Sequence, residues 1–155
     1  MATEIRVGTE TDIPQALQLV KELATYEKAP NEVEVTIEEM LGWGFGPNKQ
    51  FDFFVAMEND LMVGLALYYY KYSTWKGKCL FLEDIIVTES QRGKGLGKLL
   101  FDKVVQVSKE QKVRRMEWQV LDWNTPAIDF YKKYHAILDG EWVNCKLTNS
   151  QLNIL

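Results

Sequence analysis

The feature that most constrains the fold is a change in the spacing of apolar residues along the chain. From Ile13 to Ala24 apolar residues recur at helical spacing, and Pro30 ends that segment. The runs FDFFVAME (51–58) and LMVGLALYYYKY (61–72) then follow the pattern of strands. A chain that changes period in this way is predicted to pack helices against a sheet.

The remaining segments extend this pattern to the end of the chain. The predicted strands are residues 3–7, 51–58, 61–72, 78–87, 114–121 and 141–148, and the predicted helices are about 12–26, 36–43, 95–110 and 126–133. This order predicts an α/β (α+β) fold with a mixed, mostly antiparallel central sheet that is flanked by helices and contains one crossover helix. At 155 residues the chain is expected to form a single domain, 1–155.

Composition excludes several classes of function. A net charge of −4 argues against a nucleic-acid partner, and no apolar run has the roughly 18 residues of a membrane helix. The start MATEIRVGTE is not a secretory signal, so a cytoplasmic location is expected. Cys79 and Cys145 lie in apolar, strand-like segments, and they predict buried free thiols rather than a metal site.

The stretch QRGKGLGK (91–98) joins a predicted strand to a predicted helix. Its spacing fits neither a Walker loop nor a dinucleotide fingerprint, but it fits the pattern [RQ]-x-x-G-x-[GA]. The first N–H groups of a helix lack internal partners, and Arg92, Lys94 and Lys98 add positive charge. The stretch predicts a phosphate-binding loop; the alternative is a tight glycine turn with solvated lysines.

Two carboxylates, Glu83 and Asp84, interrupt the apolar strand 78–87. Strand alternation predicts that they point to opposite faces of the sheet. Burial of a carboxylate is costly without a partner, and it raises the pKa towards that of a useful general base. The alternatives are therefore a functional acid and a structural ion pair with a lysine.

A helix start is predicted at Asn124 or Thr125, with Pro126 at its first position. Tyr131 on this helix is either a proton donor or a packing tyrosine. His135, the only histidine, is interpreted as a chain-reversal residue rather than a ligand.

Taken together, these pieces resemble the GNAT superfamily of acyl-CoA-dependent N-acetyltransferases. Within it the chain is most similar to the spermidine/spermine (diamine) and thialysine acetyltransferases. The resemblance covers nearly the whole chain. The supporting segments are VKELATYE (20–27), GFG (44–46), LYYYKYSTWKGK (67–78), LEDIIV (82–87), QRGKGLG (91–97) and WNTPAIDFYKK (123–133).

The resemblance implies acetyl-CoA as co-substrate, no metal and a sheet splayed at the cofactor site. The implied cofactor-binding residues are Ile85, Ile86, Val87, Arg92, Gly93, Lys94, Gly95, Leu96, Gly97, Lys98, Asn124, Ala127 and Tyr131. The implied acceptor-binding residues are Tyr26, Glu27, Glu83 and Asp84. Tyr131 would protonate the departing thiolate, and Glu83 would deprotonate the amine through water. The acceptor would be a primary amine of a small molecule, and the enzyme would be a homodimer.

Other readings remain open alongside this one. The polyamine enzymes carry an acidic residue where this chain has Ser73, which weakens the expectation of a polyamine acceptor. A non-catalytic acyl-CoA sensor of the same fold and a protein N-acetyltransferase are the alternatives.

Overall fold

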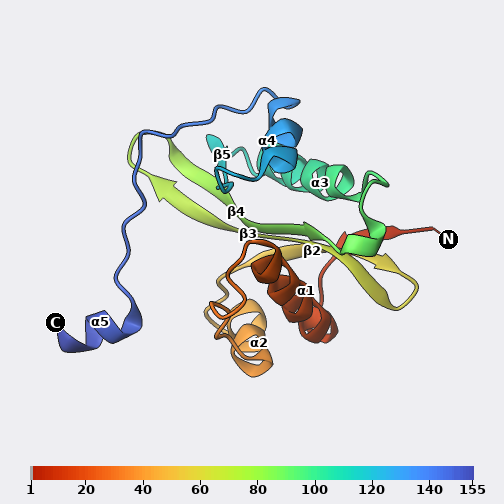
Figure 1. Cartoon of the computed structure of the whole chain (residues 1–155), viewed down its shortest axis with the longest axis horizontal. Coiled ribbons are helices and arrows are strands. Elements are labelled where there is room, and N and C mark those ends of the chain that lie inside the picture. The colour runs from red at the N-terminus through yellow and green to blue at the C-terminus, as the bar shows by residue number, and fades with distance from the viewer. Residues whose placement is uncertain (1) are drawn as a thin grey trace. The chain divides into compact units, whose positions relative to one another are not determined.

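The computed structural model describes residues 2–155 (Figure 1). The chain divides into two compact units, one ending at Gln119 and one comprising Val120–Leu155, and each is described by itself. The expectation of a single domain stays a prediction.

The first unit is built on a five-stranded sheet in the order β1-β2-β3-β4-β5. The strands are β1 (Glu4–Val7), β2 (Asp52–Glu58), β3 (Leu61–Ser73), β4 (Gly77–Val87) and β5 (Arg115–Glu117). The first four are antiparallel, and β5 pairs with β4 in parallel. The mixed, mostly antiparallel sheet predicted from the sequence is thus confirmed.

Three α-helices cover this sheet, with α1 and α2 on one face and α3 on the other (Figure 1). They are α1 (Ile13–Tyr26), α2 (Ile37–Phe45) and α3 (Leu96–Glu110), and short 3₁₀ turns occupy Glu10–Asp12 and Glu89–Gln91. Alternate residues of β2 and β3, such as Val55 and Leu65, are fully buried in a core shared with α1 and α2. On the opposite face α3 approaches β3 so closely that a Cβ on Gly64 would lie 2.8 Å from the Leu100 side chain.

The second unit contains the helices α4 (Thr125–Lys132) and α5 (Asn149–Ile154). The Asn124 side chain caps α4 by accepting a hydrogen bond from the Ala127 N–H at 3.4 Å. His135 has φ +59°, which confirms its interpretation as a chain-reversal residue.

The prediction of a strand at 141–148 is wrong for this chain. Residues 141–147 form neither helix nor strand, and Thr148 caps α5 instead. Alternation specifies a strand only when a neighbouring strand supplies hydrogen-bond partners, and no strand in residues 2–155 pairs with this segment. Cys145 is consequently exposed, contrary to expectation, whereas Cys79 in β4 is buried.

The predicted strand 114–121 is also shorter than expected, since only Arg115–Glu117 pair with β4. Within residues 2–155, no helix combines the length and apolar content that crossing a bilayer requires.

Candidate active site

The first element of the site is an open edge on β4. Only Cys79–Phe81 of this strand pair with β5, whereas β3 accompanies β4 as far as Val87. β5 ends at Glu117, opposite Phe81, so residues 82–87 pair with no strand on the β5 side in the described chain. This edge contains Ile85, Ile86 and Val87, where an extended ligand could add as a further strand.

A β-bulge in β4 places the two carboxylates. Leu67 lies opposite Asp84 and Tyr68 lies opposite Leu82, which leaves Glu83 without a counterpart on β3. The Tyr69 hydroxyl donates to Glu83 Oε2 at 3.4 Å. The prediction that Glu83 and Asp84 point to opposite faces is therefore wrong, because the bulge interrupts the alternation and brings both carboxylates towards one side.

The environment of Asp84 is acidic. Its pKa is raised to about 7, chiefly because burial removes water, and further because Glu83 and Glu27 carry like charge nearby. Burial also raises the pKa of Glu27, the C-cap residue directly after α1. Three of the predicted acceptor-binding residues thus form one cluster, which we call the acidic cluster (Glu27, Glu83 and Asp84).

The C-terminal part of α1 is fastened to the end of β4. Glu22 accepts hydrogen bonds from the Thr88 hydroxyl at 3.0 Å and from the Glu89 N–H at 3.1 Å. Arg92 Nε donates to the Val87 carbonyl at 2.9 Å, and its guanidinium lies 5.1 Å from the centre of the Tyr26 ring. Tyr26 is therefore held at the start of the glycine loop.

Sequence reasoning missed Glu22 as a positioning residue. It lies on α1 among other polar positions, and no local pattern distinguishes it from a solvated glutamate. Its role follows from a contact with Thr88, which is 66 residues away in the sequence.

The glycine loop presents a run of unused backbone donors. Within residues 2–155, no acceptor in the chain receives a hydrogen bond from the N–H groups of residues 93–98, and the ladder of α3 resumes with Leu99 donating to Gly95. Gly93 and Gly95 both have φ +81°, a conformation that other residues rarely adopt. Gly97 has no such constraint, and a Cβ there would meet only the Val87 side chain at an ordinary 3.9 Å.

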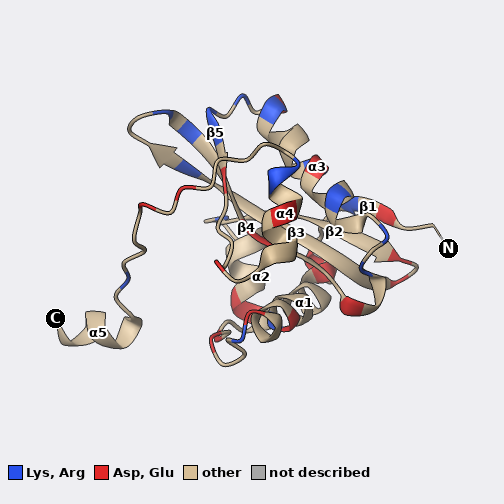
Figure 2. Ribbon diagram, turned by 45° about the horizontal axis from the view of Figure 1, so that its top comes forward, with Lys and Arg blue, Asp and Glu red and all other residues tan. Residues whose placement is uncertain are grey.

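Basic residues lie on this loop and on the α3 helix that follows it. Figure 2 shows Lys and Arg on α3 and near the β3–β4 turn, and acidic residues on the layer of α1 and α2. Lys94 donates to Gln91 at 2.6 Å, and Lys98 pairs with Asp102 at 2.6 Å. Both lysine side chains are exposed, so an incoming anion could compete for them.

The remaining predicted residues lie in the second unit, on α4. Asn124, Ala127 and Tyr131 are spaced by three and four residues, and they therefore share one face of this helix. The structure thus groups the predicted site residues into two sets, one on the first unit and one on α4.

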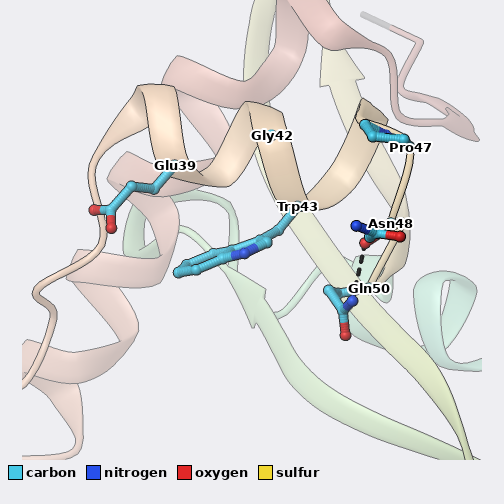
Figure 3. A pocket seen from close by; sticks show the side chains of 6 residues that line it. All are labelled: Glu39, Gly42, Trp43, Pro47, Asn48 and Gln50. Atoms are coloured by element: carbon cyan, nitrogen blue, oxygen red, sulfur yellow. Dashed lines mark hydrogen bonds between the residues drawn. The ribbon is translucent and has the colours of Figure 1, made fainter. Parts of the chain in front are cut away.

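A surface pocket lies elsewhere, at the end of α2 (Figure 3). Its lining residues are Glu39, Gly42, Trp43, Pro47, Asn48 and Gln50, and none of the predicted site residues is among them. No group of His, Cys, Asp or Glu in the described chain could hold a metal ion.

Comparison with known proteins identifies the family. The sequence model of the Acetyltransferase (GNAT) family matches residues 16–136. The chain belongs to the GNAT family of acetyltransferases. The match includes β4, the glycine loop and α4.

Curated relatives agree with this assignment. A thialysine N-epsilon-acetyltransferase of Sus scrofa is 38% identical over 140 residues, covering 85% of this chain and 82% of the relative. A protein of the same name from Bos taurus is 38% identical over 151 residues, covering 91% and 89%. The predicted assignment to an N-acetyltransferase enzyme is confirmed.

A solved structure shares the fold at low identity. An integron cassette protein from the mobile metagenome of Vibrio cholerae has a TM-score of 0.80 at 22% identity, covering 99% of this chain and 97% of that chain. The predicted GNAT fold is confirmed.

Proposed function

We propose that this GNAT enzyme transfers an acetyl group from acetyl-CoA to a primary amine of a small molecule, of the diamine, polyamine or thialysine type. The observation that carries the proposal is the acidic cluster beside the open edge of β4. A cluster of like charges without a cation is unfavourable by itself, but it attracts an ammonium group. The names of the relatives point to the same class of acceptor.

The residues of the first unit fit the cofactor that the family uses. The unused N–H groups of residues 93–98 can bind phosphate oxygens, and the missing side chain at Gly97 leaves room for them. The open edge at Ile85, Ile86 and Val87 can bind an amide-containing arm. Bound acetyl-CoA supplies an activated acetyl thioester.

The acidic cluster then prepares the amine. An ammonium ion has no lone pair for attack, so one proton must leave before the carbon–nitrogen bond forms and the carbon–sulfur bond breaks. Glu83 takes this proton through a water molecule, as the resemblance implies. Asp84, whose pKa is raised to about 7, changes its charge near neutral pH and so controls how strongly the ammonium is held.

The departing sulfur needs a proton. Tyr131 Oη on α4 donates it in this proposal, and Asn124 and Ala127 on the same helix face contact the cofactor. Proton donation of this kind contributes about 10²–10⁴-fold to a rate. The nitrogen gives up a second proton after attack, and this proton restores Tyr131. The products are therefore the amide, the free thiol of coenzyme A and the one proton that Glu83 passes to water.

An acceptor screen tests the proposal. The enzyme is mixed with acetyl-CoA and with thialysine, short diamines, spermidine, spermine or a lysine-containing peptide, and released thiol is measured. We expect release with at least one small amine and a lower kcat with Tyr131→Phe, while calorimetry shows similar acetyl-CoA affinity for both proteins.

Two other outcomes would change the assignment. Binding of acetyl-CoA without thiol release from any amine would support the sensor alternative. Release with the peptide alone would support a protein N-acetyltransferase.

A further inference from the structure

One carboxylate on α1 binds a turn that lies far away in the sequence. Glu22 accepts hydrogen bonds from the Thr88 hydroxyl, which lies 3.1 and 3.0 Å from its two oxygens, and from the Glu89 N–H at 3.1 Å. Thr88 and Glu89 begin the 3₁₀ turn that joins β4 to the glycine loop. The Thr88 side chain makes no capping hydrogen bond to this turn, so Glu22 supplies the acceptor from outside it.

Arg92, directly after that turn, is held against the same helix. Its Nε donates to the Val87 carbonyl at 2.9 Å, and one of its terminal nitrogens lies 4.0 Å from Glu22 Oε1. Its guanidinium lies 5.1 Å from the centre of the ring of Tyr26, which is one turn after Glu22 on α1. The side chain of Arg92 is thus engaged with α1 and with the last carbonyl of the open edge.

We propose that Glu22 is a positioning residue that couples the glycine loop to the end of α1, where Tyr26 and Glu27 lie. A cofactor bound at the loop orders the turn before it, and the hydrogen bonds of Glu22 transmit this order to the two predicted acceptor-binding residues. Each ligand then finds part of the ordering already done by the other. This inference rests on the proposed binding of the cofactor at the loop, and not on the identity of the acceptor.

The hydrogen bonds to the turn, rather than the ion pair, make this link. Hydrogen bonds to a charged acceptor are about twice as strong as those between neutral groups. The contact between Glu22 and Arg92 is long, and their side chains are 31% and 40% exposed, so water screens it. Loss of the Glu22 carboxylate therefore separates α1 from the start of the turn, while the bond from Arg92 to the Val87 carbonyl remains.

Amide hydrogen exchange on the full chain, with and without coenzyme A, tests the coupling. In the wild type, coenzyme A should slow exchange at the loop, residues 93–98, and should also slow it at residues 23–28 by about fivefold or more. In Glu22→Ala the loop should still be protected, but the effect at residues 23–28 should fall below about twofold. A merely structural role would instead speed exchange at residues 23–28 equally in both states, and the ratio of the two rates would not change.

Three further variants sharpen the test. Gln18→Ala is the matched control, because Gln18 is exposed on α1 one turn before Glu22, and it should keep the wild-type ratio. Glu22→Gln keeps an oxygen acceptor without the charge, so it should give an intermediate ratio, and it replaces Glu22→Ala if that variant does not fold. Thr88→Val removes the hydroxyl donor on the other side and should also reduce the ratio. Circular dichroism confirms that each variant is folded.

The contrary results differ from one another. Protection of the loop without any effect at residues 23–28 in the wild type would overturn the coupling alone, and so would a wild-type ratio in both Glu22→Ala and Glu22→Gln. An equal loss in Gln18→Ala would assign the effect to the stability of α1 and would also overturn the role of Glu22. No protection of the loop by coenzyme A would overturn the proposed cofactor site, and the coupling with it.

Discussion

Two aspartates that the fold withdraws from water, Asp12 and Asp84, differ in their surroundings. Asp12, at the start of α1, accepts hydrogen bonds from both Arg6 guanidinium nitrogens at 2.7 and 3.0 Å, and from the Thr9 N–H at 2.7 Å. The Arg6 hydrogen bond is the main reason that the pKa of Asp12 lies below its usual range. The fold therefore compensates for this buried charge.

Asp84 has no such compensation. No Lys or Arg in residues 2–155 forms an ion pair with it, and its charged neighbours in the cluster are Glu27 and Glu83. Burial and like charge raise its pKa to about 7. Removing a carboxylate from water costs free energy. Where a cationic partner offsets this cost, as at Asp12, stability explains the residue, whereas a carboxylate without such a partner, as at Asp84, is a candidate for function.

The largest expected effect that separates these aspartates is on activity. Asp84→Asn should lower kcat/KM by about 10²-fold or more, because it removes the charge that holds the ammonium. In the wild type, kcat/KM should fall as the pH drops through about 7, and this dependence should disappear in Asp84→Asn. The pH profile of released thiol on the best acceptor measures both.

Asp12→Asn is the control in that experiment, and it should keep the wild-type profile, provided that the assay temperature lies well below its melting temperature. A wild-type kcat/KM for Asp84→Asn, or an unchanged pH dependence, would show that Asp84 does not help to bind the acceptor.

The second effect is on stability, and the two aspartates should act with opposite signs. Asp12→Asn should lower the free energy of unfolding at pH 7 by about 2–3 kcal/mol, less than for a fully buried pair, because water screens the Arg6 side chain, which is 32% exposed. Asp84→Asn should raise it at pH 8 by about 1–3 kcal/mol, because a buried like-charged carboxylate is removed. Chemical denaturation at several pH values gives both numbers.

The pH windows follow from the pKa directions. Asp12 has a lowered folded pKa, so its contribution is present above the unfolded pKa near 3.8 and is lost as the pH falls through the folded value. Asp84 has a raised folded pKa, so the wild type loses stability as the pH rises from 3.8 to about 7. The gain in the free energy of unfolding from Asp84→Asn should therefore disappear near pH 4. If both Asp12→Asn and Asp84→Asn changed the free energy of unfolding in the same direction at pH 8, this explanation would be contradicted.

These aspartates also show what the sequence could predict. Spacing and turn residues located the strands up to Val87, the helices α1 to α4 and the chain reversal at His135. The bulge at Glu83 could not be predicted, because it depends on the register between β3 and β4 and not on local alternation. The strand prediction for residues 141–148 failed for the same reason, because a strand requires a partner strand, and the sequence of the segment alone does not show whether one is present.

Gly95 and Gly97 of the glycine loop differ in the same way, since the fold explains one of them and not the other. The positive φ of Gly95 is explained by the turn, but nothing in the fold requires Gly97. Gly97→Ala should therefore keep the wild-type melting temperature while weakening acetyl-CoA binding at least tenfold, about 1.4 kcal/mol, because its methyl group enters the path of the phosphates. Calorimetric titration with acetyl-CoA measures this change.

Gly95→Ala serves as the comparison, because it should lower both the melting temperature and the affinity through backbone strain. Unchanged acetyl-CoA affinity in Gly97→Ala would show that the loop does not bind the cofactor.

The smallest expected effect concerns Ser73, a polar residue whose place the fold explains. Its hydroxyl accepts hydrogen bonds from the N–H groups of Trp75 and Lys76, both at 3.2 Å, in the β3–β4 turn. Leu67, opposite Asp84, precedes Ser73 by six residues on β3, so about 20 Å of strand separates the two positions. An acid at 73 could then meet only a distal charge of a long polyamine.

Ser73→Asp should raise kcat/KM for spermine and spermidine by at most about fivefold, since a solvent-screened charge pair contributes up to about 1 kcal/mol. Thialysine and short diamines do not extend that far, so their values should not change. Ser73→Asn is the control, because it keeps a turn acceptor without the charge. If spermine is already the best acceptor of the wild type, or if Asp and Asn at this position act alike, charge at residue 73 does not select the acceptor.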